Sequence, residues 1–235
     1  PKIMGPTTRQ IHEEFDYFSK IFDQYGQTYI ANGAFDDYGL GTKFPWTKME
    51  ELKGVKIGAA GPNLPWLDYA GASKVQTNLN EVYNALQSGV YSGVVIFPAP
   101  YFGFKFGEVA KYYTTMGWGS VVAYPMTVNN NTWAKLPDSV KKIIMEETGV
   151  YNVAVEDEGV RKFTSALENL KKQGVTVRDL GNDERNKMAK AIEPWVNEKA
   201  AEYEALGFPG KATFNRLYEL AKENGAKPVH DYVIK

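Results

Sequence analysis

Two short apolar runs with a helical pattern between them constrain the fold more than any other stretch. Residues 55–61 alternate apolar and polar or small residues and stop at a glycine, whereas residues 93–98 form an apolar run that stops at Pro98. Between them, residues 78–89 carry apolar side chains at the i, i+3 and i+4 spacing of one buried helix face. A strand, a helix and a strand with short joints predict a parallel sheet with a right-handed crossover. Ligands bind such sheets beyond the carboxyl ends of the strands.

The rest of the chain alternates between helical and extended patterns. In the central helix, Asn78 and Glu81 are spaced as an N-terminal capping pair, and Gly89 is placed to end it. Pro125 interrupts a strand pattern and indicates an edge, a bulge or a crossing point. We predict helices over 8–25, 138–174, 182–206 and 212–224, strands over 28–31, 74–77, 120–128 and 175–180, and a loop over 32–46.

Size and charge limit the possible functions. The 235 residues are enough for one large domain or two small ones, and 43% of them are hydrophobic, so a core can form. The 27 basic and 28 acidic residues nearly cancel, and the formal net charge is -1. A chain without a basic excess does not favour nucleic acid or an anionic membrane surface as a partner.

Cysteine content and hydrophobic run lengths narrow the possibilities further. The chain has no cysteine, which excludes disulfides, thiolate catalysis and cysteine-bound zinc. No apolar run reaches the roughly 18 residues that a bilayer span needs, so we expect no membrane insertion. No signal peptide is present, and we expect any export signal to have been removed or to lie outside this sequence.

Four stretches resemble one protein family, in the same order along the chain. They are residues 52–57, 80–90, 104–112 and 128–137. The family is the extracytoplasmic solute-binding receptors of tripartite ATP-independent periplasmic (TRAP) transporters, and the resemblance covers most of residues 28–180. Family members usually begin well before the position of Pro1, so the resemblance implies that the N-terminal part of lobe I is lacking.

The resemblance implies an α/β fold like that of periplasmic binding proteins. It has two lobes, mixed and mostly parallel sheets, and a long helix that spans both lobes. By analogy, residues 1–31 and 124–162 are the remnant of lobe I, and residues 32–123 and 163–235 form lobe II with the C-terminal helices. Such a receptor is periplasmic, needs no cofactor and catalyses nothing. It closes on a small organic solute and delivers it to a membrane permease.

The resemblance also indicates where a ligand binds. Family arginines that clamp a carboxylate correspond to Gly58 and Phe35, a family aromatic residue to Leu79, and a ligand-binding asparagine to about Ile96. With the clamp absent, both an organic acid and an aromatic or apolar solute stay open. Loop and strand-end positions add further candidates, because binding residues concentrate there. The candidate ligand-binding residues are Phe35, Gly58, Asn63, Trp66, Tyr69, Leu79, Ile96, Phe97, Tyr101 and Trp118.

Each candidate residue can also be explained by a purely structural role. Gly58 can be a plain strand-end glycine, and buried apolar residues usually only fill a core. Asp36, Asp37 and Asp68 carry oxygen ligands that suit calcium, but two adjacent Asp residues are unlike a calcium loop. We therefore expect solvated loop acids and no metal site. An enzyme on a similar scaffold that acts on a small carbonyl compound is the alternative function, and it requires a titratable pair in its cleft. The two histidines, His12 and His230, have no such partner at suggestive spacing.

Overall fold

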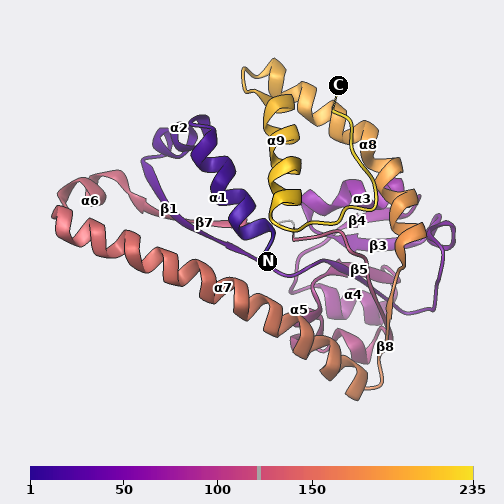
Figure 1. Cartoon of the computed structure of the whole chain (residues 1–235). Helices are drawn as coiled ribbons and strands as arrows, with labels where there is room; N and C mark the ends of the chain where they lie inside the picture. The colour runs from indigo at the N-terminus through magenta and orange to yellow at the C-terminus, as the bar shows by residue number, and fades with distance from the viewer. Residues whose placement is uncertain (121–122, 235) are drawn as a thin grey trace.

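The strands form two sheets that are linked by the segment 35–38 (Figure 1). The structure is a computed structural model, and it describes residues 1–120 and 123–234. The strands are β1 (Gln27–Ala34), β2 (Gly39–Thr42), β3 (Lys56–Ala59), β4 (Ser73–Gln76), β5 (Gly93–Ile96), β6 (Tyr112–Thr115), β7 (Ala123–Asn129) and β8 (Thr176–Asp179). The α-helices are α1 (Met4–Glu14), α2 (Tyr17–Gln24), α3 (Leu64–Tyr69), α4 (Val82–Ser88), α5 (Pro98–Gly103), α6 (Asn130–Lys135), α7 (Asp138–Lys172), α8 (Asn182–Ala205) and α9 (Gly210–Glu223). Short 3-10 helices are η1 (Met49–Leu52), η2 (Gly61–Asn63) and η3 (Phe106–Glu108).

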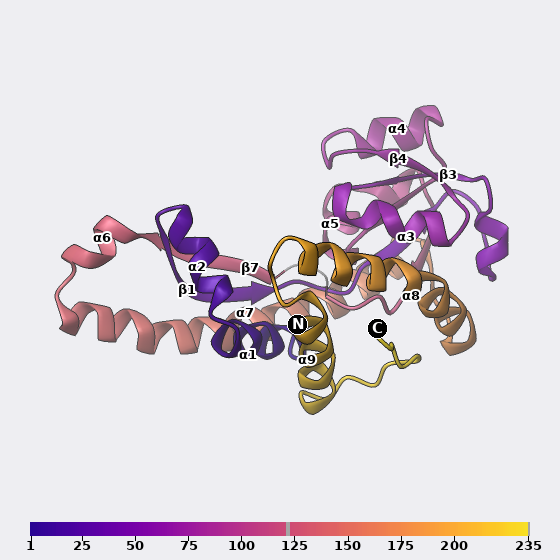
Figure 2. The same cartoon turned by 90° about the horizontal axis from the view of Figure 1, so that it is seen from above.

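The two sheets belong to two lobes. The smaller sheet is an antiparallel ribbon of β1 and β7, and α1, α2 and α6 lie beside it (Figure 2). The large sheet has the strand order β4-β3-β5-β2-β6-β8. In it, β3 pairs in parallel with β4 and β5, β6 pairs in parallel with β8, and β2 runs antiparallel between β5 and β6. The predicted two-lobed α/β fold with a mixed sheet is confirmed.

The helix α7 connects the lobes. It has 35 residues, which at 1.5 Å per residue corresponds to about 50 Å. Its first part packs on β1, and its last part packs on α5 and β8 (Figure 1). The long helix predicted after Leu136 is therefore confirmed, and Gly149 and Gly159 lie inside it without ending it.

The central strand–helix–strand unit has the predicted topology. Gly58 of β3 pairs with Val94 of β5, and Ile96 lies two residues beyond Val94 on the same strand. Because side chains alternate along a strand, Gly58, Val94 and Ile96 share one face of the sheet. Val94 and Ile96 pack in the core cluster with α4 and α5, whereas Ile57 and Val95 belong to the cluster on the other face.

A tyrosine occupies the space beside Gly58. A Cβ atom at Gly58 would lie 2.9 Å from the Tyr91 ring and 3.1 Å from the Thr77 side chain. The Tyr91 hydroxyl and Thr77 Oγ1 form a hydrogen bond of 3.0 Å, and both side chains are buried. The glycine therefore allows a close approach of core side chains to the strand.

The predicted loop over 32–46 is wrong in part. β1 continues to Ala34, and β2 lies inside the same stretch. β2 is rich in glycine because aromatic rings lie directly over it. A Cβ atom would meet the Tyr113 side chain at Gly39 and the Tyr101 side chain at Gly41. Strand propensities predict against glycine in a strand, because they do not include the space that Tyr101 and Tyr113 need over β2.

Two helix starts or breaks also differ from the expectation. The single helix predicted over 8–25 is two helices, because Phe15 adopts an extended conformation between α1 and α2. The central helix α4 begins at Val82 with Glu81 at the N-cap, and Asn78 instead accepts a hydrogen bond from the Asn80 backbone. Gly89 ends α4 in the left-handed region, as predicted.

The strand predicted over 120–128 is found as β7, and Val121 and Val122 lie outside the described residues.

The packing at Gly58 gives a test of the fold. We expect Gly58→Ala to lower the free energy of unfolding by about 1–3 kcal/mol, because the added methyl group overpacks Tyr91 and Thr77. Gly61→Ala is the matched control, since its nearest contact would be 3.9 Å away on the Gln76 side chain. Urea denaturation measures both changes. Equal losses for the two variants would contradict the close packing described here.

Candidate ligand-binding site

One edge of the large sheet gathers the segments that follow strand ends. The parallel strands β3 and β5 end at Ala59 and Ile96, and Gly39 at the start of β2 lies opposite Ile96 and Thr115. The segment 35–38 enters this edge from the ribbon. The chain leaves it again after β6, through the loop that begins at Met116. Loops from three strands and the crossing segment therefore meet where the two lobes face each other.

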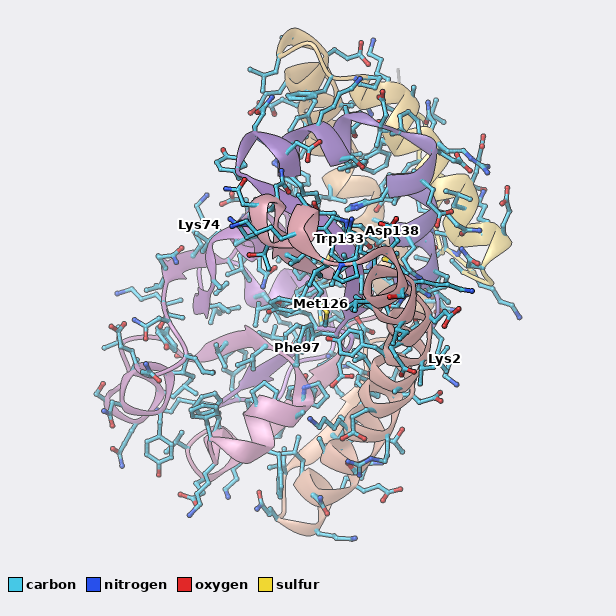
Figure 3. All side chains as sticks on the ribbon, turned by 90° about the vertical axis from the view of Figure 1, so that its left-hand side faces the viewer. Lys2, Lys74, Phe97, Met126, Trp133 and Asp138 are labelled. Atoms are coloured by element: carbon cyan, nitrogen blue, oxygen red, sulfur yellow. The ribbon has the colours of Figure 1, made fainter. Side chains whose placement is uncertain are left out.

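Aromatic rings form a continuous series along this edge. Centroid distances between successive rings are 4.1 Å for Tyr124 and Phe35, 6.2 Å for Phe35 and Phe97, 3.9 Å for Phe97 and Tyr38, 5.4 Å for Tyr38 and Trp66, and 4.6 Å for Trp66 and Trp118. We call these six residues the aromatic row. Figure 3 shows Phe97 near the centre of the molecule, seen from the side of the ribbon.

The two ends of the row differ in exposure. Phe35 and Tyr124 are 42% and 50% exposed, although both are large apolar rings beside the crossing between lobes. At the other end, Trp66 is buried and Trp118 is half-buried, and the Trp118 ring N–H donates to the Met188 sulfur at 2.8 Å. Exposed neighbouring rings indicate a surface that stacks on a partner or a ligand.

A cavity of about 590 Å³ opens beside Trp66 and Trp118. Its walls come from residues 1–4, from the loop 116–120, from α8 through Met188 and Ile192, and from the C-terminal segment 226–232. Asp37 of the crossing segment contributes a carboxylate to the same cavity. The volume lies within the range of small-molecule sites, and the walls are mainly apolar with few polar groups.

Asn63 supplies a buried polar group near the row. It follows β3, stands at the N-cap position of α3 without a capping hydrogen bond from its side chain, and is 2% exposed. A hydrogen bond from Asn63 opposes the rise that burial causes in the pKa of Tyr38. The Oδ1 atom of Asn63 is buried and lacks a hydrogen-bond partner among the described residues. An unpaired buried acceptor is costly, and a donor on a ligand would satisfy it.

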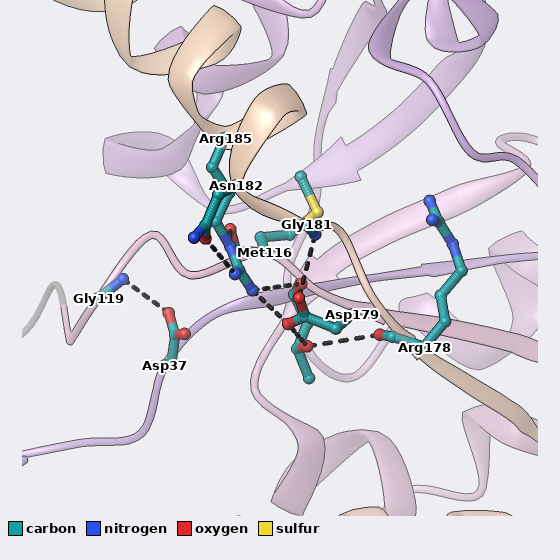
Figure 4. Close-up of polar contacts among 9 residues, drawn as sticks. Asp37, Met116, Gly119, Arg178, Asp179, Gly181, Asn182 and Arg185 are labelled. Atoms are coloured by element: carbon teal, nitrogen blue, oxygen red, sulfur yellow. Dashed lines mark hydrogen bonds and ion pairs between the residues drawn. The ribbon is translucent and has the colours of Figure 1, made fainter. Parts of the chain in front are cut away.

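Two adjacent carboxyl groups have perturbed titration. Burial raises the pKa of Asp37 to about 6, against the opposing effect of the Gly119 amide, which donates to Asp37 Oδ1 at 2.7 Å (Figure 4). Burial also raises the pKa of Asp36 to about 6, and Asp36 is only 5% exposed with an unpaired Oδ1 atom. Burial is the largest cause of both shifts, so it does not move the two pKa values apart into those of an acid and a base.

An arginine on α8 is already satisfied. Arg185 donates to the Met116 carbonyl at 2.9 Å and to Asn182 at 3.3 Å, and it forms an ion pair with Asp179 (Figure 4). These contacts fix the loop after β6 against the start of α8. Its charge is therefore balanced by Asp179 within the protein.

The predicted site residues fall into separate groups. Phe35, Phe97, Trp66 and Trp118 belong to the aromatic row, and Asn63 lies beside it. Leu79 is exposed in the turn after β4, at the same edge of the sheet. Tyr69 lies at the far end of α3, two residues before Gly71, whose carbonyl accepts a hydrogen bond from Gly54 near the start of β3.

Three other candidates lie in the core. Tyr101 has no exposed surface, and its hydroxyl donates to the Ala110 carbonyl at 2.6 Å. Ile96 packs in the same cluster, and its carbonyl accepts a hydrogen bond from Tyr113. Gly58 is buried against Tyr91. In this conformation these three residues pack in the core below the edge of the sheet.

Sequence reasoning did not include Tyr38, Tyr124 or Asp37 among the ligand-binding candidates. Tyr38, Leu40 and Thr42 alternate with the glycines at 39 and 41, and this period of two was a signal for a strand. Recognising it would have placed Tyr38 at a strand end. The role of Tyr124 depends on its contact with Phe35, which is 89 positions away along the chain and has no local signal.

Other kinds of site find little support. Within residues 1–120 and 123–234, no three His, Asp or Glu side chains lie close enough together to hold a metal ion. Among the helices that the structure describes, none is both long and apolar enough to cross a membrane.

Comparison with known proteins points to one family. The sequence profile of the bacterial extracellular solute-binding proteins, family 7, matches residues 13–203. A solute-binding protein of Sulfitobacter sp. strain NAS-14.1 is 28% identical over 169 residues, which cover 68% of this chain and 49% of the relative. The C4-dicarboxylate-binding periplasmic protein DctP of Rhodobacter capsulatus is 28% identical over 181 residues, with 73% and 53% covered. The chain thus spans about half the length of these curated relatives.

A solved structure supports the same relationship. A TRAP periplasmic solute-binding protein from Desulfovibrio salexigens, with bound orotic acid, superposes with a TM-score of 0.75 and 26% identity. The match covers 89% of this chain and 67% of that protein.

Because Asp36 is buried, replacing its carboxyl group by the amide of asparagine should stabilise the fold in a pH-dependent way. Because its pKa is raised on folding, the ionised carboxylate favours the unfolded chain as pH rises from about 4 to 6. We expect Asp36→Asn to raise the free energy of unfolding by about 1–2 kcal/mol at pH 7.5, allowing for solvent screening, and most of this gain to disappear at pH 4. Urea denaturation at both pH values measures it.

Asp16→Asn is the control for this prediction, because the Asp16 side chain is exposed at the surface. A gain at Asp36 that is the same at both pH values, or a gain of equal size at Asp16, would show that ionisation of Asp36 carries no folding cost.

Proposed function

Because the chain belongs to the bacterial extracellular solute-binding protein family 7, we propose that it acts as a periplasmic receptor for a small organic solute. The receptor captures the solute between two lobes and delivers it to the membrane permease of a TRAP transporter. The aromatic row carries this proposal, because it places stacking surfaces where the strands β3 and β5 end and the lobes meet.

The lobes of the receptor follow the division made from the sequence. Residues 1–31 and 124–162 form the remnant of lobe I, and residues 32–123 and 163–235 form lobe II with the C-terminal helices. Bending at the crossing segments, such as Tyr124 and Pro125, closes the lobes on the solute. Tyr124 and Pro125 pair with Gly33 and Asn32 in the ribbon, so a change there moves the whole ribbon relative to the large sheet.

The ligand-binding residues follow from the arrangement of the edge. The aromatic row and Asn63 contact the solute directly, and Tyr38 and Tyr124 join the residues named from the sequence. Leu79 borders the site from the turn after β4. Gly58, Ile96 and Tyr101 support the site through core packing, and Tyr69 contributes from the far end of α3.

The class of solute is the open part of the proposal. One similar protein binds C4-dicarboxylates, and one similar solved structure contains bound orotic acid. An organic acid is therefore one candidate. An aromatic or apolar compound is the other, because Phe35 and Gly58, which the resemblance matches to family arginines, provide no positive charge. Affinity then comes from stacking and buried apolar area, and backbone donors at strand ends add specificity.

Receptor function implies that the solute leaves unchanged. The alternative, an enzyme acting on a small carbonyl compound, has less support because the family match is to solute-binding proteins and burial raises the pKa values of Asp36 and Asp37 in the same direction. Chemical analysis of a bound solute after long incubation distinguishes the two functions, since only an enzyme converts it.

Calorimetric titration tests the receptor and its site. We expect the protein at its full natural length to bind at least one member of a panel of organic acids and neutral aromatic solutes. Phe35→Ala should weaken that binding about tenfold through lost stacking, with little loss of folding stability because Phe35 is partly exposed. Tyr25→Ala, an exposed tyrosine after α2, is the matched control.

Two results would count against the proposal. Failure of the whole panel to bind would remove the receptor function. Equal weakening by Phe35→Ala and Tyr25→Ala would remove the aromatic row as the site.

A further inference from the structure

We propose that the solute carries a positively charged nitrogen group beside a flat or apolar body, and that Asp37 with Trp66 and Trp118 receives that group. The inference rests on the proposed receptor function and names the charge of its solute. It differs from the expectation of a carboxylate, which the family resemblance alone implies.

The first step is the loss of cations at the edge. Gly58 has no side chain, and the buried Tyr91 ring fills the space that one would need. Phe35 likewise carries no charge, and its ring packs on Tyr124 and Phe97. A carboxylate bound here would meet aromatic rings, whose faces carry partial negative charge.

The second step is the balance of charge around the cavity. Lys2 is paired with Asp157 at 2.5 Å, Arg185 is paired with Asp179, and His230 lies 2.8 Å from Glu193. Asp37 forms no ion pair with a basic side chain among the described residues and accepts from the Gly119 amide instead. The charges of Arg185 and of the amine at Pro1 both oppose the rise that burial causes in the pKa of Asp37. Lys227 remains as an exposed side chain on the C-terminal segment. The Asp37 carboxylate beside the tryptophan rings therefore accepts from a backbone amide and has no ion-pair partner among the described side chains.

The third step is the shape of the wall. Trp66 and Trp118 lie 4.6 Å apart with their planes inclined by 51°, and both line the cavity next to Asp37. Indole rings are the strongest cation–π acceptors among protein side chains. A carboxylate and two indole rings around one space attract an ammonium or similar nitrogen cation and leave its apolar body against Met188 and Ile192.

Two other observations agree with this assignment. Asn63 lies three positions before Trp66 and is almost fully buried, and its side-chain oxygen has no hydrogen-bond donor. An N–H group of a ligand near the aromatic row would supply that donor. Burial raises the pKa of Asp37 to about 6, and a bound cation would favour the ionised carboxylate there.

Three probes with one ring and different charge test the inference. They are benzyltrimethylammonium, benzyl alcohol and phenylacetate, titrated at pH 8 into the protein at its full natural length, with ligand-observed NMR as the readout. We expect the cation to bind about tenfold more tightly than the anion, with the alcohol between them.

Variants separate charge from structure. Asp37→Asn keeps the shape of the side chain and an acceptor for the Gly119 amide. It should weaken benzyltrimethylammonium about tenfold and leave benzyl alcohol within about twofold. Asp68→Asn, at an exposed carboxylate of α3 that pairs with Lys74, is the control and should change neither.

The outcomes distinguish this inference from the receptor function. If phenylacetate or another organic acid binds best, or if Asp37→Asn leaves the cation unaffected, the charge assignment is wrong and the receptor function stands. If neither these probes nor the wider panel of solutes binds, the receptor function fails and the inference fails with it.

Discussion

The parallel pairing of β3 with β5 is the constraint on which the rest of the structure depends. It brings the ends of both strands to one edge of the large sheet, so that the segments after Ala59 and Ile96 emerge side by side. β2 then enters the same edge in the opposite direction, directly from the ribbon. The aromatic row forms because residues before β2, after β3, after β5 and after β6 meet there.

The parts of this arrangement that depend on local periodicity could be predicted from the sequence. The period of 2 in β3, the period of 3.6 in α4 and the long helical pattern of α7 are properties of single segments. β2 was missed because its glycines are required by Tyr101 and Tyr113, which reach it from elsewhere in the chain. No local pattern at positions 39 and 41 contains that information.

The site was predictable to a similar extent. Strand ends and aromatic side chains indicated Phe97, Trp66 and Trp118. What the sequence could not indicate was which candidates face outward. Tyr101 is an aromatic residue after a strand end, like Phe97, but it turns into the core and bonds to Ala110. The burial of Asp37 likewise depends on the loop that follows β6, a contact between segments about 80 residues apart.

The continuity of α7 has a mechanical consequence. A single rod of 35 residues packs on β1 at one end and on β8 at the other, with no break at either of its glycines. Two lobes that both pack on one continuous helix cannot slide past each other unless the helix bends. Their relative motion is then limited to a change in the angle between them, and this angle alone describes how open or closed the molecule is.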